Sequence, residues 1–301
     1  MFVVVAGRTR LCSIFRRDFF SSRRLGRDHA YPIGSCFFSS LEPPTVLFQD
    51  NHLLVVNKPA GWHSVPNPGP HSPKCLLSRL KQMKLGGGSN KDFLLPLHRL
   101  DQPCTGVILF AKTSKAATRV TSLWKRKLVE KEYLCVVQTD RVKSLLANAR
   151  DPQDCAGRCW YALWGTLHPS RESRSVVVRS IGSHSNEHSG DRKVSVRFHV
   201  MDSEIKNCNY LLLRVKTNEG SRHMVRAMLA QVGGCPIAGD MRYGFMDQKS
   251  LRDRSVALHA FRLTLDSTQL KLGSLETFTF HAPIPHSWKE FFGMSSSNNG
   301  R

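Results

Sequence analysis

The sequence predicts an α+β domain in which strands outnumber helices. Short apolar runs between turn residues, such as Val107–Ala111, are typical of buried strands, and Val194–Val200 alternates between apolar and polar residues as a half-buried strand does. Ser114–Lys127 is one of the few segments with a helical period. Of the 301 residues, 41% are hydrophobic, which is enough for one large core or two lobes.

Six elements are expected in the first half of the chain. A turn-like cluster at Gln49–His52 separates two apolar runs and predicts a hairpin, and a loop rich in Pro, Gly, His and Ser follows at 59–73. The expected elements are, in order, strands Val46–Phe48 and Leu53–Val56, a helix over Cys75–Leu85 ended by Gly86–Gly88, the strand Val107–Ala111, the helix Ser114–Lys127 and the strand Lys131–Val137.

The second half is expected to add four strands and one helix. Tyr210–Val215 has the pattern of a strand that neighbours Val194–Val200. Pro283 and Pro285 are expected to close the domain. The expected elements are strands Val194–Val200, Tyr210–Val215, Ala257–Leu265 and Phe278–Phe280, and the helix Ser221–Ala230.

The chain is strongly basic. It has 44 Lys and Arg against 23 Asp and Glu, a formal net charge of +21, so a polyanion, and nucleic acid above all, is the expected partner. A basic surface without a partner and a protein bound to a membrane surface are the alternatives. The sequence has neither a long apolar span nor a basic amphipathic helix long enough to favour a bilayer, so we expect no membrane partner.

The first forty residues differ in composition from the rest. They hold seven Arg, no Lys and only two acidic residues, Asp18 and Asp28, with Ser and Phe interspersed. This composition is typical of an organellar transit peptide. We expect a mitochondrial protein, with a plastid or other organelle, the cytoplasm or the nucleus as alternatives. A disordered basic arm that binds RNA is the other interpretation of the segment, whereas Arg pairs and the lack of a clean h-region weaken a secretory signal.

Nine cysteines are scattered without a paired framework. Cys135 and Cys208 lie in apolar runs, where a free cysteine behaves as a small hydrophobic residue, so a reducing compartment is expected. Cys155 and Cys159, with His168 nearby, form an arrangement that suggests a metal. A structural zinc site would need a second Cys pair, which does not follow, and we expect no metal.

The segment most indicative of chemistry is His98-Arg99-Leu100-Asp101. A single carboxylate lies beside two cationic or cationisable side chains, and a turn with Thr105-Gly106 and the apolar run Val107–Ala111 follows it. A positioned acid or nucleophile needs such an arrangement. Alone, the pattern also fits an Asp that starts a turn and accepts hydrogen bonds from the next backbone amides.

Together with three further segments, this motif resembles the RluA-type pseudouridine synthases. The matches occur in the family's order and span about Thr45 to Trp288. The opening strand and turn of the family resemble Leu54–Gly61, the strand that carries its active-site Tyr resembles Lys131–Leu134, and its third motif resembles His223–Arg226 with Leu229-Ala230, Gly239-Asp240 and Tyr243-Gly244.

The resemblance implies a mixed α+β catalytic fold with a long, largely antiparallel sheet and a central cleft. Many relatives carry an S4-type RNA-binding domain before the catalytic domain, but here only the transit-like segment precedes Thr45, so no S4 domain is expected. The expected parts are a transit-like disordered segment (1–40), a catalytic domain (41–290) and a disordered tail (291–301). Residues 166–193, which are polar and rich in Ser and Arg, are expected to form a surface loop or an RNA-facing insertion.

The resemblance assigns catalytic roles to three residues. Asp101 would attack C1' of the nucleotide or assist loss of uracil as a glycal, and both routes stay open. An ionised carboxylate in a low-dielectric cleft needs a cation beside it, and the resemblance nominates Arg226. Tyr133 would place its ring against uracil and take the C5 proton late in the reaction. Taken alone, Arg226 also fits a solvated surface residue and Tyr133 a packed strand residue.

Five further residues are expected to bind the substrate. The target base must be flipped out of its stack, and Arg99 is placed to fill the vacated space or to hold the phosphate. His98 is expected to orient the loop rather than to transfer protons. Lys58 is a candidate phosphate contact unless it is simply solvated. Thr105 and His223 complete the set.

The third motif departs from the family's usual Gly-Arg-Thr-His-Gln-Ile-Arg. The chain has GSRHMVR at 220–226, so Ser221 replaces the first Arg and Met224 replaces Gln, whereas the His and the final Arg keep their spacing. The departure affects the RNA contact expected of this turn more than the catalytic pair. Cys104 is a mild change within the first motif.

The sequence thus predicts an RNA pseudouridine synthase that acts, as a monomer, on specific uridines of rRNA, tRNA or organellar mRNA. The reaction involves no redox change, and the sequence has neither a Gly-rich phosphate loop nor a metal-ligand cluster, so no cofactor is expected. The alternative is a catalytically silent RNA-binding or ribosome-assembly factor with the same fold, which would not need Asp101, Tyr133 and Arg226 together. A zinc deaminase is excluded because no His-x-Glu followed by Cys-x-x-Cys is present.

Overall fold

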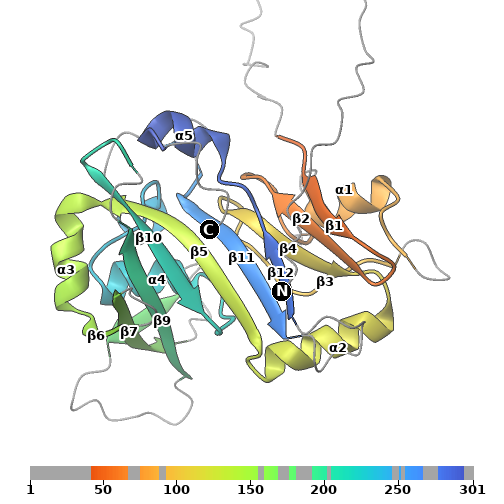
Figure 1. The fold of residues 1–301 in the computed structure, drawn as a ribbon, viewed down its shortest axis with the longest axis horizontal. Coiled ribbons are helices and arrows are strands. Elements are labelled where there is room, and N and C mark those ends of the chain that lie inside the picture. The colour runs from red at the N-terminus through yellow and green to blue at the C-terminus, as the bar shows by residue number, and fades with distance from the viewer. Residues whose placement is uncertain are drawn as a thin grey trace, which may run out of the picture.

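A computed structural model describes most of the chain, in which the strands join into one large sheet with helices packed against it (Figure 1). The predicted transit-like segment, 1–40, lies outside the described residues. The described residues are 42–66, 75–87, 93–154, 159–168, 176–180, 192–201, 205–245, 251, 255–266 and 277–294.

Twelve strands form the sheet of the described residues. They are β1 (Thr45–Gln49), β2 (Leu53–Lys58), β3 (Leu95–Pro96), β4 (Thr105–Ala111), β5 (Val129–Gln138), β6 (Arg150–Asp154), β7 (Cys159–His168), β8 (Val177–Ser180), β9 (Arg192–Met201), β10 (Tyr210–Thr217), β11 (Leu258–Asp266) and β12 (Thr277–His281). The order is β1-β2-β4-β11-β5-β10-β9-β7-β6, with β12 paired to β11, β3 to β4 and β8 to β7.

Most neighbouring strands are antiparallel, which confirms the predicted mixed, largely antiparallel sheet. The expected hairpin forms from β1 and β2, and β9 and β10 are the antiparallel neighbours that their sequences predict. Strands β4 and β11 run parallel instead, with His259 beside Thr105 and Ala260 beside Gly106. This parallel contact lies at the start of β4, immediately after the turn that carries Asp101.

Helices and short helical turns cover parts of the sheet. In Figure 1, α1 lies beside β1 and β2, α2 lies below β3 and β4, and α5 lies at the upper end of β5 and β10. The α-helices are α1 (Leu76–Gln82), α2 (Ser114–Lys125), α3 (Val142–Ala147), α4 (Met224–Ala227) and α5 (His286–Phe292), and the turns are η1 (Thr139–Arg141), the π-helical η2 (Met228–Val232) and η3 (Met241–Tyr243).

Helix α2 confirms the sequence expectation for Ser114–Lys127. Thr113 precedes it in an extended conformation, and its side chain accepts a hydrogen bond from the backbone N–H of Ala116, as an N-cap residue does. Val120 and Leu123 recur at helical spacing and are buried in one hydrophobic cluster with Leu109 of β4. The apolar face of α2 thereby fixes the far end of β4, opposite the end that adjoins Asp101.

Strand β5 connects the largest hydrophobic cluster to the cleft. Alternate residues of a strand share a face, so Lys131, Tyr133, Cys135 and Val137 lie on the same side. Cys135 and Val137 are buried in the cluster with residues of α4 and η2, whereas Lys131 and Tyr133 line the cleft. The sheet therefore places the Tyr ring where the core ends and the cleft begins.

Two of the expected helices have other limits. The first ends at Gln82 rather than at the glycines, because Lys84 adopts a left-handed φ of 55°. The helix expected at Ser221–Ala230 begins only at Met224, because His223 has a φ of 54°, and it continues as η2. A left-handed residue is incompatible with a right-handed helix.

The polar segment 166–193 is not a loop throughout. Strand β7 extends to His168, Val177–Ser180 form β8, and β9 begins at Arg192. Val178 is buried beside Gly165 of β7, so a short β-branched run inside a polar segment pairs where the average composition predicts loop. Residues 169–175 and 181–191 lie outside the described part.

The carboxyl-terminal end also differs from the expectation. Pro283 and Pro285 do not close the domain, because α5 follows them and buries Trp288 and Phe292 completely. A tail that begins at residue 291 is therefore too long, since Phe292 belongs to the core and Met294 pairs with Ile205. Proline is tolerated at the start of a helix because the first N–H groups of a helix have no partner within it. A helix can therefore follow Pro285 directly.

Candidate active site

Asp101 lies on a short turn between β3 and β4 that is held from below by the loop after β2. The backbone N–H of Cys104 donates to the carbonyl of Asp101 at 3.1 Å, which closes the turn. The Ser64 hydroxyl accepts from the N–H of Leu100 at 3.0 Å and donates to its carbonyl at 2.7 Å. The N–H of Gly61 donates to the carbonyl of Gln102 at 2.9 Å. The carboxylate is thus attached to a rigid backbone.

Lys58 belongs to this scaffold and not to the phosphate-binding surface predicted for it. Its side chain is fully buried, and Nζ donates to the carbonyls of Pro59, Gln102 and Cys104 at 3.0, 3.1 and 2.6 Å. Burial lowers the pKa of Lys58 to about 8, although the nearby Cys104 and Asp101 oppose the shift. All three ammonium protons are used, so Lys58 clamps the turn and has none left for RNA.

Gly106 and Thr105 join the turn to β11. Gly106 has a φ of 114°, and a Cβ there would lie 2.3 Å from the carbonyl oxygen of Ala260, so only glycine allows this parallel contact. The Thr105 hydroxyl bonds to Nδ1 of His259 at 2.8 Å, and Nε2 of His259 lies 3.3 Å from the carbonyl of Ala282. Thr105 lines the cleft as predicted, but its hydroxyl is engaged with the core.

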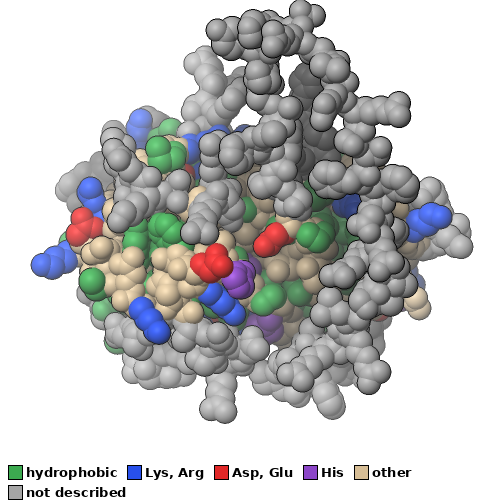
Figure 2. Space-filling view, turned by 90° about the horizontal axis from the view of Figure 1, so that it is seen from above, with side chains coloured by type: hydrophobic (Ala, Val, Ile, Leu, Met, Phe, Trp, Pro, Cys, Tyr) green, Lys and Arg blue, Asp and Glu red, His purple; other side chains and the backbone are tan. Residues whose placement is uncertain are grey.

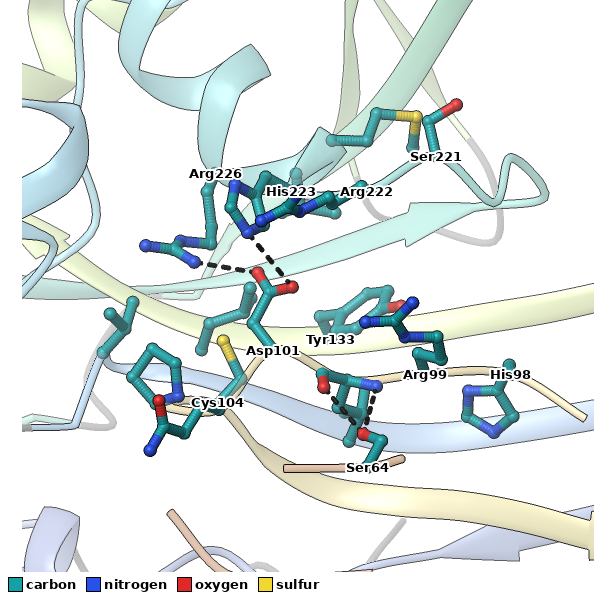
Figure 3. A pocket seen from close by; sticks show the side chains of 18 of the residues that line it. Ser64, His98, Arg99, Asp101, Cys104, Tyr133, Ser221, Arg222, His223 and Arg226 are labelled. Atoms are coloured by element: carbon teal, nitrogen blue, oxygen red, sulfur yellow. Dashed lines mark hydrogen bonds and ion pairs between the residues drawn. The ribbon is translucent and has the colours of Figure 1, made fainter. Parts of the chain in front are cut away.

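Arg226 binds Asp101 directly, as the resemblance implies. Nη1 of Arg226 lies 2.8 Å from Oδ2 of Asp101 (Figure 3), while Nε and Nη2 lie 2.7 and 2.8 Å from the two oxygens of Asp240. The side chains of Arg226 and Asp240 are 4% and 1% exposed, against 22% for Asp101. Burial opposes the charge of Arg226, but the hydrogen bonds to Asp240 and Asp101 outweigh it and raise the pKa.

His223 approaches the other oxygen of Asp101. Its Nε2 lies 3.5 Å from Oδ1 of Asp101, and its Nδ1 lies 3.1 Å from the hydroxyl of Tyr243. Burial lowers the pKa of His223 to about 4, helped by Arg226, Arg222 and Arg242 and opposed by Asp101. The ring is therefore neutral at neutral pH, and the left-handed φ of His223, which delays the start of α4 to Met224, directs the ring toward Asp101.

Tyr133 faces the same cleft from β5. Its side chain is half-buried, and burial, followed by the nearby Cys104 and Asp101, raises the pKa of Tyr133 above its usual value. The cleft has a volume of about 1130 Å³ and is lined by Asp101, Tyr133 and Arg226 together. The predicted catalytic trio is thus brought into one cavity.

His98 and Arg99 lie at one side of this cavity with different environments. Nε2 of His98 accepts a hydrogen bond from the N–H of Leu109 at 3.0 Å, and its ring stacks on Trp124 with centroids 5.2 Å apart. Burial and the nearby Lys131 lower the pKa of His98 to about 3, so it orients the loop as a neutral group. Arg99 is exposed at the rim, where it is free to reach a ligand.

The distribution of charge on the surface of the described residues does not by itself mark the site. In Figure 2, Lys and Arg side chains are spread over the face seen from above and do not form one block. Among the described residues no helix is long and apolar enough to cross a membrane, and no group of three or more His, Cys, Asp and Glu side chains is arranged to hold a metal ion.

Sequence reasoning gave no role to Asp240, Tyr243 or Ser64. Asp240 and Tyr243 lie in the third matched motif, so a signal existed, but only the structure shows that they contact Arg226 and His223. No sequence signal marks Ser64, because its bonds to Leu100 join segments 36 residues apart.

The chain belongs to the RNA pseudouridylate synthase family, whose profile matches residues 52–231. The carboxylate, the buried arginine and the half-buried tyrosine of the cleft all come from the motifs on which the RluA-type resemblance rests. The predicted family and enzyme class are confirmed: the chain is an RNA pseudouridine synthase of the RluA type.

Several curated relatives match most of the chain. The dual-specificity RNA pseudouridine synthase RluA of Haemophilus influenzae is 31% identical over 79% of this chain and 91% of its own length. The tRNA pseudouridine synthase C of the same organism is 26% identical over 84% and 98%. The ribosomal large subunit pseudouridine synthase C of Rickettsia prowazekii is 27% identical over 78% and 69%.

Two solved structures share the fold. Human RNA Pseudouridylate Synthase Domain Containing 4 superposes with a TM-score of 0.57 at 18% identity and covers 84% of this chain and 95% of its own. Human RNA Pseudouridylate Synthase Domain Containing 1 gives the same TM-score and identity over 82% and 86%. The predicted fold class is thereby confirmed.

Proposed function

We propose that this chain isomerises a uridine within RNA to pseudouridine, with Asp101 as the catalytic carboxylate. The observation that carries the proposal is the 2.8 Å ion pair between Asp101 and Arg226 in a cleft that also contains Tyr133. A buried guanidinium is the partner that an ionised carboxylate needs in such a cleft. A protein that only binds RNA has no use for this trio, which argues against the catalytically silent alternative.

The reaction exchanges one bond of the base for another. The N1–C1' bond breaks, uracil rotates within the cleft, and a C5–C1' bond forms, while C5 loses a proton and N1 gains one. Asp101 would either add to C1' as uracil leaves or assist loss of uracil as a glycal. Both routes need an anionic group fixed at C1', and Arg226 fixes it.

Tyr133 would serve the last step. Its ring offers uracil an apolar surface, and its raised pKa keeps the phenol protonated at neutral pH. Because the phenol stays protonated, its oxygen would take the C5 proton only as its own proton passes to a neighbouring acceptor, for which the Asp101 carboxylate, released once the C5–C1' bond has formed, is the candidate. Asp101 would then give this proton to solvent, and N1 would take its proton from solvent.

The arginines of the rim would hold the RNA. Arg99 and Arg222 line the cleft and are exposed, so they would contact phosphates next to the flipped nucleotide or fill the space that it leaves. We propose rRNA, tRNA or organellar mRNA as the substrate class. We also propose that a monomer acts, because Asp101, Tyr133 and Arg226 of a single chain line one cleft.

The test is a site-resolved pseudouridine map of total RNA from cells that lack the protein, rescued with wild type or with Asp101→Asn. The Asn side chain has nearly the same shape but no charge. A uridine whose modification disappears and returns only with wild type would support both the activity and the role of Asp101. Rescue by both proteins would contradict the role of Asp101, and the absence of any changed site would contradict the activity.

We also propose that residues 1–40 direct the protein to mitochondria. The support is their composition alone, with seven Arg, no Lys and two acidic residues, which suits an import signal. Deletion of residues 1–40 is expected to abolish import while in vitro turnover persists. A truncated protein that still enters the organelle would contradict the proposal.

A further inference from the structure

Arg226 and His223, the two residues that contact the Asp101 carboxylate, both pack against the ring of Tyr243. The guanidinium carbon of Arg226 lies 5.3 Å from the centroid of the Tyr243 ring, within the range of a cation–π contact. The His223 ring meets the same Tyr ring edge-on, with centroids 5.9 Å apart. Since Arg226 approaches Oδ2 of Asp101 and His223 approaches Oδ1, one side chain supports both contacts.

The hydrogen bonds of Tyr243 fix the protonation of His223. The backbone N–H of Val176 donates to the Tyr243 oxygen at 2.9 Å, so the phenol accepts there and has its proton left for Nδ1 of His223 at 3.1 Å. A neutral imidazole that accepts at Nδ1 carries its proton at Nε2. That N–H is the one that points at Asp101, as the dashed line in Figure 3 marks.

Val176 leads directly into β8, which a second side chain attaches to the same region. Gln231 of η2 accepts from the N–H of Val178 at 2.7 Å and donates to the carbonyl of Val176 at 3.2 Å. The position of the Val176 N–H thus depends on Gln231, and the orientation of Tyr243 depends on Val176. The π-helical turn that follows α4 places Gln231 for these two bonds.

We propose that Tyr243 is a positioning residue through which the attachment of β8 orients Asp101 for catalysis. The inference rests on the proposed function of Asp101. Tyr243 is not among the residues that line the cleft, and its proton and one lone pair are engaged by His223 and Val176, so it acts through His223 and Arg226. Burial raises the pKa of Tyr243, which keeps its hydroxyl a donor at neutral pH.

The proposal distinguishes the chemical step from RNA binding. Without the Tyr243 hydroxyl, the proton of His223 can lie on either Nδ1 or Nε2. In the Nδ1 form, Nε2 has no proton to direct at Oδ1 of Asp101. A carboxylate that is displaced from its reacting position slows the chemical step, whereas the cleft rim that binds RNA is unchanged.

The experiment measures tritium release from total RNA that is labelled with [5-³H]uridine and taken from cells lacking the protein. With protein in excess, the rate at saturating protein reports the chemical step, and the half-saturating protein concentration reports RNA binding. The variants are Tyr243→Phe, Gln231→Glu, Asp101→Asn and the matched control Tyr161→Phe, whose ring stacks on Phe198 of the neighbouring strand and does not line the cleft.

We expect Tyr243→Phe to lower the saturating rate by about tenfold or more at an unchanged half-saturating concentration. Gln231→Glu should act in the same direction, because a carboxylate cannot donate to the Val176 carbonyl, and Tyr161→Phe should match wild type. Equal unfolding midpoints for Gln231→Glu and wild type would separate this effect from misfolding, should Tyr243→Phe fold poorly.

Three outcomes would overturn the proposal. A saturating rate of Tyr243→Phe and Gln231→Glu equal to wild type would remove the positioning role while the loss of turnover in Asp101→Asn still supports the proposed function. A change confined to the half-saturating concentration would make Tyr243 a contributor to RNA binding. Turnover by Asp101→Asn would overturn the proposed function and the inference together.

Discussion

Arg226 binds two carboxylates with one guanidinium: that of Asp101, which is 22% exposed, and that of Asp240, which is 1% exposed. Two of its nitrogens chelate the buried Asp240, and the third donates to Oδ2 of Asp101 at 2.8 Å. The bidentate pair sets the plane of the guanidinium, and the plane sets the direction of the remaining N–H. Asp240 therefore determines where the charge that faces Asp101 lies.

Arg226→Lys is expected to lower turnover by about a hundredfold or more, with RNA affinity nearly unchanged. An ammonium keeps the charge but is a point charge without the planar fork, so it cannot chelate Asp240 and reach Asp101 at once. Single-turnover rates and filter binding of the same RNA check the two effects. Equal losses in rate and affinity would instead identify Arg226 as an RNA-binding residue.

Asp240→Ala is expected to destabilise the fold by about 3 kcal/mol, because it leaves the buried Arg226 without its main partner. Urea unfolding measures the change in the free energy of unfolding. The control is Asp140→Ala, whose side chain is 74% exposed in a 3.9 Å pair with Arg141 and should change stability by less than about 1 kcal/mol. A small effect of Asp240→Ala would mean that water replaces the carboxylate.

Tyr133→Phe is expected to preserve RNA affinity and to slow release of the C5 hydrogen by about a hundredfold. The ring that would contact uracil remains, whereas the oxygen that would receive the proton is lost. Tritium release from RNA labelled at C5 measures the step directly. Release at the wild-type rate would contradict the role of the hydroxyl and leave Tyr133 with a packing role.

The three residues proposed for catalysis could be singled out from the sequence because each lies in a segment with its own pattern. Asp101 follows a charged turn and precedes a continuous apolar run, and Tyr133 and Arg226 occupy matched motifs in a fixed order. Their convergence in one cavity depends on the order of the strands in the sheet. Local sequence patterns do not give this order, and it was expected only because the resemblance implies the family's fold.

The expectations that the structure contradicts share one physical cause: contacts between residues distant in sequence override local composition. Lys58 has the surroundings of a surface lysine until the carbonyls of Gln102 and Cys104, more than forty residues away, surround its ammonium. The helical period of Ser221–Ala230 does not reveal that His223 turns left-handed to face Asp101. Val177–Ser180 form a strand because they pair with β7, and Gln231, more than fifty residues away, adds hydrogen bonds to Val176 and Val178.

RNA binding is expected to depend on pH, because the pKa of Lys131 in the cleft is lowered. Lys131 lines the cleft, its Nζ donates to the carbonyl of Glu219, and burial lowers its pKa to about 8, against the opposing charge of Glu219. The cleft therefore holds this cation below pH 8 and loses it above, so RNA affinity should fall as the pH rises from 7 to 9. Between pH 8 and the unfolded value of 10.5 the folded chain binds fewer protons than the unfolded chain, so the contribution of Lys131 to stability rises with pH there.

Two substitutions separate this effect from the general weakening of basic contacts. Lys131→Arg keeps the charge to far higher pH and should remove the fall near pH 8, whereas Lys131→Gln should bind weakly at pH 7 and show no fall. Lys58 titrates in the same range, but it clamps the Asp101 turn outside the cleft, so its deprotonation should lower the saturating rate and not the affinity. Filter binding at constant ionic strength from pH 6.5 to 9.5 measures the affinity, and a fall near pH 8 that persists in Lys131→Arg would assign it to another group.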